Sequence, residues 1–133
     1  MPRNLEEIPL EEREYFDKMY CALKDQFPKE CACGRVYENE LEYNSNTSTN
    51  VGNKKSRIWD ASEMGMYLFL RNCDCGSTLS LGIDREKFDE DNWADFIGYI
   101  NGRAKKENRT FLDVFQNEVA EEYHQYLEDK LKE

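Results

Sequence analysis

Two copies of one short cysteine pattern constrain this chain more than any other feature of its sequence. Four of the five cysteines lie in two segments, Cys31-Ala32-Cys33-Gly34 and Cys73-Asp74-Cys75-Gly76. Unrelated structural cysteines rarely repeat a pattern, whereas the two halves of one metal site do. Side chains at i and i+2 of an extended chain point to the same side, so each pair offers two thiolates. The pattern predicts one zinc ion with four ligands: Cys31, Cys33, Cys73 and Cys75.

A glycine, Gly34 or Gly76, follows the second cysteine of each pair. Tetrahedral zinc with Zn–S bonds near 2.3 Å needs sulfur atoms only about 3.8 Å apart, so the chain must curl inward at each pair. Glycine permits this curl because it takes a positive φ without a Cβ clash, and it lets backbone N–H groups turn toward the thiolates. Two disulfides, four unrelated buried cysteines and an iron–sulfur cluster are the alternatives to zinc.

The length and charge of the chain limit its fold and its partners. With 133 residues, 39% of them hydrophobic, we expect a single zinc-binding domain over residues 1–133 with a real core. The formal net charge is −10, and four thiolates around one divalent cation add about −2. Such a charge argues against nucleic acid and anionic lipid and favours a protein partner.

The sequence also indicates a compartment. The N-terminal segment has no positively charged region followed by an apolar run, and no later segment approaches eighteen apolar residues. We therefore expect a cytoplasmic protein with no membrane span. Because the cytosol keeps thiols reduced, a cytoplasmic location favours metal binding over disulfides for these cysteines.

Apolar residues with helical spacing mark both ends of the chain. Phe16, Met19, Leu23 and their neighbours form one stripe, which predicts a helix over residues 9–27. Residues 89–131 should form a helical part with two helices, the first capped near Asp89 and ended by Gly102. The second should begin at a capping box at Thr110 and carry an apolar face of Leu112, Phe115, Val119, Tyr123, Tyr126 and Leu127.

The segment between the helices, residues 31–83, reads as a zinc-bearing antiparallel sheet. Alternation predicts a half-exposed strand over residues 35–43, and residues 44–53 are typical of a loop. The apolar run 66–70 predicts a central strand covered on both faces, and residues 77–83 complete a hairpin around the second cysteine pair. We expect an α+β fold: a small antiparallel sheet of three or four strands with a tetracysteine zinc site, flanked by one N-terminal and two C-terminal helices.

The doubled Cys-x-Cys-Gly pattern resembles the knuckles of zinc-ribbon proteins, in which two cysteine-bearing turns clamp one zinc ion. The resemblance covers residues 31–83 and carries over only the four cysteine ligands. The usual knuckle, Cys-x-x-Cys-Gly, is one residue longer than either pair in this chain. Cys-x-Cys beside a metal also resembles the redox-regulated heat-shock chaperones of bacteria, although these pair it with Cys-x-x-Cys.

A non-enzymatic, zinc-stabilised protein-interaction or regulatory domain is the leading functional interpretation. A closed tetrathiolate leaves no open position for a catalytic water, and no spare His-Glu or Ser-His pair stands in the sequence. The alternatives are a redox-responsive zinc protein, an acidic mimic of nucleic acid, and, last, a nucleic-acid-binding zinc ribbon. That last function would have to use the basic patches Lys54, Lys55 and Arg57, and Arg103 to Arg109.

The acidic face of the last helix, with Glu121, Glu122 and Glu128, is the expected contact with a protein partner. Two further residues have chemistry but no assigned role. Cys21 stands outside both pairs, and we expect an ordinary buried residue. His124, the only histidine, lies among apolar residues and is expected to be a surface or hydrogen-bonded residue rather than a base or ligand.

Overall fold

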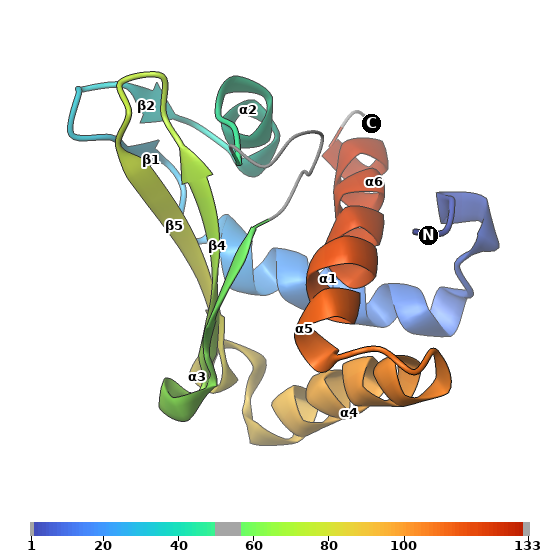
Figure 1. Cartoon of the computed structure of the whole chain (residues 1–133). Coiled ribbons are helices and arrows are strands. Elements are labelled where there is room, and N and C mark those ends of the chain that lie inside the picture. Colours follow the sequence, from blue (N-terminus) through green and yellow to red (C-terminus); the bar gives the residue numbers. More distant parts are fainter. Residues whose placement is uncertain (1, 50–56, 132–133) are drawn as a thin grey trace.

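The computed structural model describes residues 2–49 and 57–131 (Figure 1). In chain order its elements are η1 (Leu5–Glu7), α1 (Leu10–Lys24), β1 (Lys29–Glu30), β2 (Val36–Tyr37), α2 (Glu40–Asn46), β3 (Ile58–Ala61), η2 (Ser62–Met64), β4 (Met66–Asn72), β5 (Thr78–Asp84), α3 (Arg85–Phe88), α4 (Glu90–Lys106), α5 (Phe111–Val114), the π-helical turn η3 (Phe115–Val119) and α6 (Ala120–Leu131).

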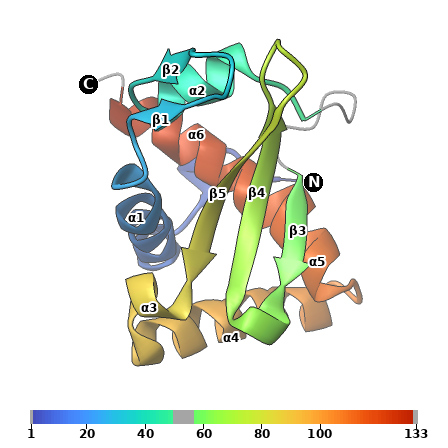
Figure 2. The same cartoon turned by 90° about the vertical axis from the view of Figure 1, so that its left-hand side faces the viewer.

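The strands form two antiparallel sheets, which gives the expected α+β fold. The larger has the order β3-β4-β5, with β4 in the centre, and β1 pairs only with β2. Helices α1, α4 and α6 lie on one side of the larger sheet, and the small sheet stands beyond its end (Figures 1 and 2). The sequence interpretation of residues 31–83 as one sheet is therefore corrected, because the first cysteine pair belongs to the separate β1–β2 ladder.

An aromatic core joins the sheet to the helices. The distance between ring centroids is 5.2 Å from Tyr67 to Phe115 and 5.8 Å from Phe69 to Phe115, and both Tyr67 and Phe69 belong to β4. Phe96 of α4 lies 5.7 Å from the same ring. The predicted apolar stripe of α1 is buried in the core as well, including Phe16. Edge-to-face aromatic pairs of this kind add to the stabilisation from burying apolar area.

Two predicted helix starts are confirmed by their caps. An Asp89 carboxylate oxygen accepts the backbone N–H of Asn92 at 3.0 Å, and the Thr110 hydroxyl accepts that of Asp113 at 3.1 Å. The predicted end at Gly102 is wrong, because α4 continues through it to Lys106. Asn108 takes the left-handed conformation, with φ of 54°, that ends the helix.

The strand predicted for residues 35–43 is wrong beyond β2. Asn39 caps a new helix, α2, by accepting the backbone N–H of Glu42 at 2.9 Å. Glu40 is buried at the start of α2, where the hydroxyl of Tyr123 in α6 donates to it at 2.8 Å, and burial raises the pKa of Glu40 to about 7. The contact with α6 therefore stabilises a helix in a segment whose alternating apolar and polar residues predict a strand. The expected loop begins only after Asn46, and residues 50–53 lie outside the described part.

A buried ion network ties the N-terminal segment to α4 and α6. Glu122 has no exposed side-chain surface and lies 3.0 Å from an Arg3 nitrogen and 2.8 Å from an Arg103 nitrogen. Burial alone would raise the pKa of Glu122, and the hydrogen bonds from the two arginines overcome it and lower that pKa. Glu122 is therefore not part of an exposed acidic face, which corrects the sequence interpretation.

Candidate metal centre

The first cysteine pair lies in the tight turn between β1 and β2. The N–H of Gly34 donates to the carbonyl of Cys31 at 2.9 Å, and the N–H of Cys31 donates to the carbonyl of Arg35 at 2.9 Å. Gly34 has a φ of 94°, a left-handed conformation that favours glycine. A Cβ at Gly34 would meet no atom within 4 Å, so the backbone angle rather than lack of space explains this glycine.

The second pair forms the same turn between β4 and β5. Gly76 donates to the carbonyl of Cys73 at 2.9 Å, Cys73 donates to the carbonyl of Ser77 at 2.9 Å, and φ of Gly76 is again 94°. This hydrogen-bond pattern, with glycine at the fourth position, is that of a hairpin turn closed by a glycine bulge. The repeated pattern thus encodes one turn twice, and the predicted hairpin around the second pair is confirmed.

The two turns bring the four predicted ligand sulfurs to one point. All four Sγ atoms lie within 4.8 Å of one another. Two of these distances join different turns: Cys31 to Cys75 at 3.4 Å and Cys33 to Cys73 at 3.8 Å. A tetrahedral four-sulfur site with bonds near 2.3 Å has edges of about 3.8 Å, so the cluster is compatible with one metal ion. Cys31 and Cys73 are buried, whereas Cys33 and Cys75 are exposed.

Hydrogen bonds favour the thiolate form on the second turn. The backbone N–H of Cys75 and the hydroxyl of Tyr37, which donates to the Cys73 sulfur at 3.1 Å, lower the pKa of Cys73. The side chain and then the backbone of Ser77 lower the pKa of Cys75 to about 6. Burial raises the pKa of Tyr37 to about 12, so its hydroxyl remains a donor at neutral pH. Metal binding requires thiolates, and these contacts supply them.

The pKa of Cys33 moves in the opposite direction. A backbone hydrogen bond involving Arg35 lowers it, but the contact with Cys31, burial, and the contacts with Cys73 and Cys75 together raise it to about 11. Four thiolates this close repel one another, so they cannot all ionise without a cation among them. The donor set, four sulfurs and no oxygen or nitrogen, is the one that suits zinc and other thiophilic metals.

Sequence reasoning missed the contacts around the ligands. Tyr37 lies in the strand predicted for residues 35–43, and the equivalent place after the second cysteine pair is Leu79, so no repeated pattern marks Tyr37 as a contact of the site. The guanidinium of Arg35 lies 3.3 Å from the carboxylate of Asp74 and joins the two turns. This pair is exposed, and exposed ion pairs stabilise proteins little.

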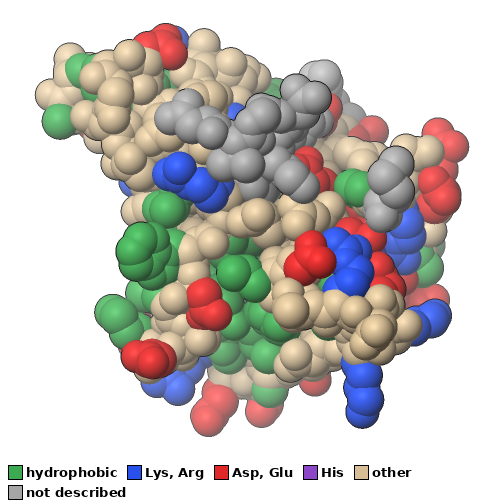
Figure 3. All heavy atoms as spheres, in the orientation of Figure 1, with side chains coloured by type: hydrophobic (Ala, Val, Ile, Leu, Met, Phe, Trp, Pro, Cys, Tyr) green, Lys and Arg blue, Asp and Glu red, His purple; other side chains and the backbone are tan. Residues whose placement is uncertain are grey.

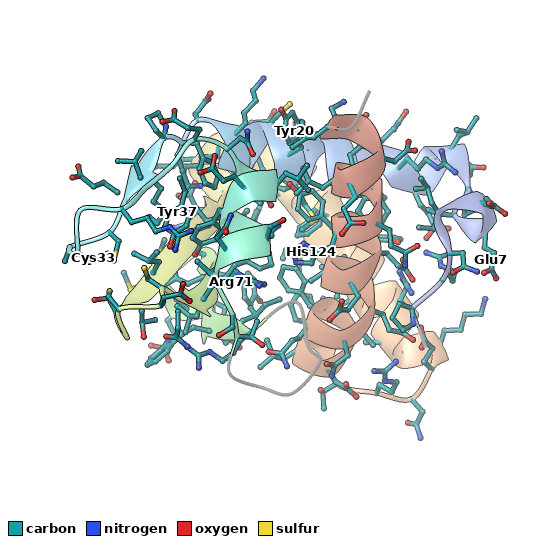
Figure 4. All side chains as sticks on the ribbon, turned by 90° about the horizontal axis from the view of Figure 1, so that it is seen from above. Glu7, Tyr20, Cys33, Tyr37, Arg71 and His124 are labelled. Atoms are coloured by element: carbon teal, nitrogen blue, oxygen red, sulfur yellow. The ribbon has the colours of Figure 1, made fainter. Side chains whose placement is uncertain are left out.

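The other candidate residues lie away from this cluster. Cys21 is exposed on α1, so the expectation of burial is wrong for it. His124 is buried on α6 with Nδ1 3.2 Å from the side-chain nitrogen of Asn44, and Figure 4 shows it far from Cys33. Neither belongs to the group of possible metal ligands among the described residues. Lys54 and Lys55 lie outside the part that the structure describes.

Acidic partners neutralise the arginines of the second basic patch. Arg103 contacts Glu118 at 3.3 Å as well as Glu122, and Arg109 contacts Glu118 at 2.8 Å and Asp113 at 2.8 Å. Guanidinium groups held by carboxylates offer little to phosphate, which weakens the case for nucleic-acid binding. Lys105 and Lys106 of the same patch are exposed.

Comparison with protein families, with curated proteins and with solved structures finds no match to this chain. The likeness to zinc ribbons therefore depends on the cysteine pattern and the turn geometry. None of the helices in residues 2–49 and 57–131 is both long enough and apolar enough to cross a membrane.

Proposed function

We propose that this chain is a zinc-stabilised, non-enzymatic protein-interaction domain of the cytoplasm. The observation that carries the proposal is the convergence of four thiol groups, two from each turn, within 4.8 Å. Four protein ligands complete the coordination of zinc, and a complete shell is typical of structural rather than catalytic sites. The ion would hold the β1–β2 turn against the β4–β5 turn, which belong to separate sheets.

Protein purified without added metal is expected to contain one zinc ion per chain and no iron. Four thiolate ligands suit zinc, and replacing it with cobalt should give the intense visible bands of a four-sulfur site. Elemental analysis and absorption spectroscopy make both measurements. Protein that is metal-free and fully folded would refute the metal site, and iron in place of zinc would assign an iron–sulfur cluster.

Measuring the zinc content after treatment with peroxide distinguishes a structural zinc site from a redox-responsive one. Cys33 and Cys75 are exposed, and exposed thiolates react first with peroxide. A structural site should keep its zinc in peroxide that modifies exposed Cys21. Loss of zinc under milder conditions, restored by a thiol reductant, would instead support a redox-responsive protein.

The net charge of the chain supports the proposed binding of a protein partner. A net charge of −10 accelerates association with positively charged proteins and makes it sensitive to salt. We expect the immobilised chain to capture protein from an extract of its source cell, and added salt to reduce the capture. Nuclease treatment should change nothing. Recovery of nucleic acid rather than protein would contradict this function, whereas capture of nucleic-acid-binding proteins alone would favour the acidic mimic.

A further inference from the structure

On the face of the larger sheet that turns away from the helices, β4 is apolar, whereas the β5 residues paired with it include Ser80 and Asp84, and no described element covers this face. Residues of β4 alternate: Tyr67, Phe69 and Arg71 are buried under the helices, while Met66, Leu68 and Leu70 are half-buried on the opposite face. Figure 2 looks directly at this second face and shows α4, α5 and α6 behind the sheet. The predicted cover on both sides of β4 is therefore wrong for the described residues, and the apolar sequence of the strand remains unexplained.

Neighbouring strands extend this apolar surface. Trp59 of β3, Leu68 of β4 and Gly82 of β5 lie in one row across the sheet, because they are paired in register. Trp59 is 62% exposed, and Met64, in the turn next to β4, is 72% exposed. We call the surface formed by Trp59, Met64, Met66, Leu68 and Leu70 the outer face. Contiguous exposed apolar patches mark interaction sites more often than single exposed side chains do.

The charges next to the outer face indicate what it contacts. A groove of about 350 Å³ runs along β3 and η2, and among the described residues its lining contains two acidic residues and no lysine or arginine: Trp59, Asp60, Ala61, Ser62, Glu63 and Met64. At the β5 edge of the same face the Lys87 ammonium lies 3.4 Å from the carbonyl oxygen of Gly82. Asp60 accepts the backbone N–H of Ser62 at 2.9 Å, which fixes its position at the groove. Asp60 is paired with Tyr67, so its side chain lies on the opposite face of β3 from Trp59, and Glu63 in η2 is the other carboxylate of the groove. An aromatic ring in a groove lined by acidic residues suits a cationic side chain, whose stem packs on the ring and whose head pairs with an acid.

A second copy of this chain is the less favourable occupant. Two copies would each bring a net charge of −10, and like charges oppose association. The outer face is also small. Strands β4 and β5 have seven residues and β3 has four, so at about 3.3 Å per residue and about 4.8 Å between strands the face spans roughly 290 Å², well below the roughly 800 Å² per partner of a stable interface. A short, positively charged segment needs less area and gains from the charge.

We propose that the outer face binds a segment of another protein in which apolar residues alternate with arginine or lysine. The apolar residues pack on Leu68 and Met66, and one basic side chain enters the groove beside Trp59. This inference rests on the proposed interaction function and locates it on the sheet rather than on the last helix. Charge complementarity, exposed apolar area and the groove support the same occupant.

A ten-residue synthetic peptide of alternating leucine and arginine is the probe for this proposal. We expect it to bind the zinc-loaded chain in calorimetry, to reduce acrylamide quenching of tryptophan fluorescence, and to bind more weakly as salt rises. Peptides of leucine with glutamate, or of serine with arginine, should bind at least about tenfold more weakly, because each lacks one half of the complementarity. Equal binding of the serine–arginine peptide would show that charge alone is recognised and would overturn the proposal.

Substitutions on the outer face and on α1 test where the leucine–arginine peptide binds. Trp59→Ser should weaken binding of the leucine–arginine peptide by about tenfold or more, since exposed aromatic anchors dominate such interfaces. Leu10→Ser removes another highly exposed apolar side chain, on α1, and should leave binding unchanged. Asp60→Asn combined with Glu63→Gln keeps the hydrogen-bond acceptors and should weaken binding and reduce its salt dependence. Glu14→Lys, at an exposed position on α1, is the matched control for charge.

Two results would reject the outer face as the binding surface. One is peptide binding that is indifferent to Trp59→Ser, and the other is sedimentation showing that the outer face pairs two copies of this chain. Other results would contradict the proposed function itself. These are a chain that contains no zinc and a chain that captures no protein. A chain that captures a partner equally well with Trp59→Ser keeps its function and loses only this surface.

Discussion

The Cys73→Ser variant is expected to lose its zinc, with stoichiometry falling from one ion per chain to none. Cys73 is buried at the centre of the site, and its sulfur accepts the hydroxyl hydrogen bond of Tyr37. Serine provides no thiolate, so the coordination shell is broken and the two turns lose their link. Structural zinc contributes roughly 10 to 16 kcal/mol to the folding of zinc-finger peptides, far more than a typical single contact.

The loss of structure should be local. The β1–β2 ladder has only two residues per strand, whereas the far end of β4 packs on the aromatic core. Hydrogen exchange should therefore accelerate in residues 29–37 and 72–78 of the variant, while α4 and α6 remain protected. Chelation of zinc from the wild-type chain should give the same pattern. The control is Cys21→Ser, at an exposed cysteine outside the cluster, which should keep one zinc.

A folded Cys73→Ser chain that retains zinc would contradict the assigned ligand set. Unfolding of all elements in one step would show a different error. In that case the helical core has too little stability of its own, and the ion supports the entire chain.

The second large effect is expected from Glu122→Ala. The carboxylate of Glu122 has no exposed surface and binds both Arg3 and Arg103. Removing one member of a buried ion network leaves the remaining charges without compensation, which costs about 3 to 5 kcal/mol. Arg3 keeps Glu12 at 2.7 Å, and Arg103 keeps Glu118 at 3.3 Å, so we expect the lower end of that range.

Denaturant unfolding at several pH values tests this expectation. The pKa of Glu122 is lowered in the folded chain, so its stabilising contribution is present above the ordinary value of 4.5 and is lost as the pH falls through the folded value. The free-energy difference between wild type and Glu122→Ala should therefore be largest at pH 7 and shrink in acid. Asp129→Ala removes an exposed carboxylate from the same helix and should change stability by less than about 0.5 kcal/mol.

A small effect of Glu122→Ala at pH 7 would mean that the network contributes little. A large effect that does not change with pH would point to packing rather than charge. Glu122→Gln separates these explanations, because glutamine keeps the size of the side chain and removes only its charge.

The repeated cysteine pattern by itself determined the candidate site. Two cysteines and a following glycine define one turn with few conformations, so its duplication placed four sulfurs without knowledge of the rest of the fold. The helices at both ends were equally visible in the sequence. Their apolar stripes and their caps at Asp89 and Thr110 are local properties, and local properties can be read along the chain.

Only the tertiary structure decided features that depend on contacts between distant residues. Asn39 caps a helix and Glu40 begins it, where a strand is expected, because α2 packs on α6 with Tyr123 as the partner. The sequence places Glu122 on an exposed acidic face of the last helix. In the folded chain Arg3, which is 119 residues away in the sequence, binds the carboxylate of Glu122. Composition cannot show which charges meet, because an ion network forms only between elements already brought together by the core.

The same limit explains the outer face of the sheet. The run from Met66 to Leu70 indicated a strand that avoids water, and sequence alone could not say which of its two faces the helices cover. The structure decided this by placing α1, α4 and α6 on one side. Side chains alternate along a strand, so covering one face leaves Leu68 and its neighbours on the other. Apolar character is a property of the residues, whereas burial is a property of the arrangement.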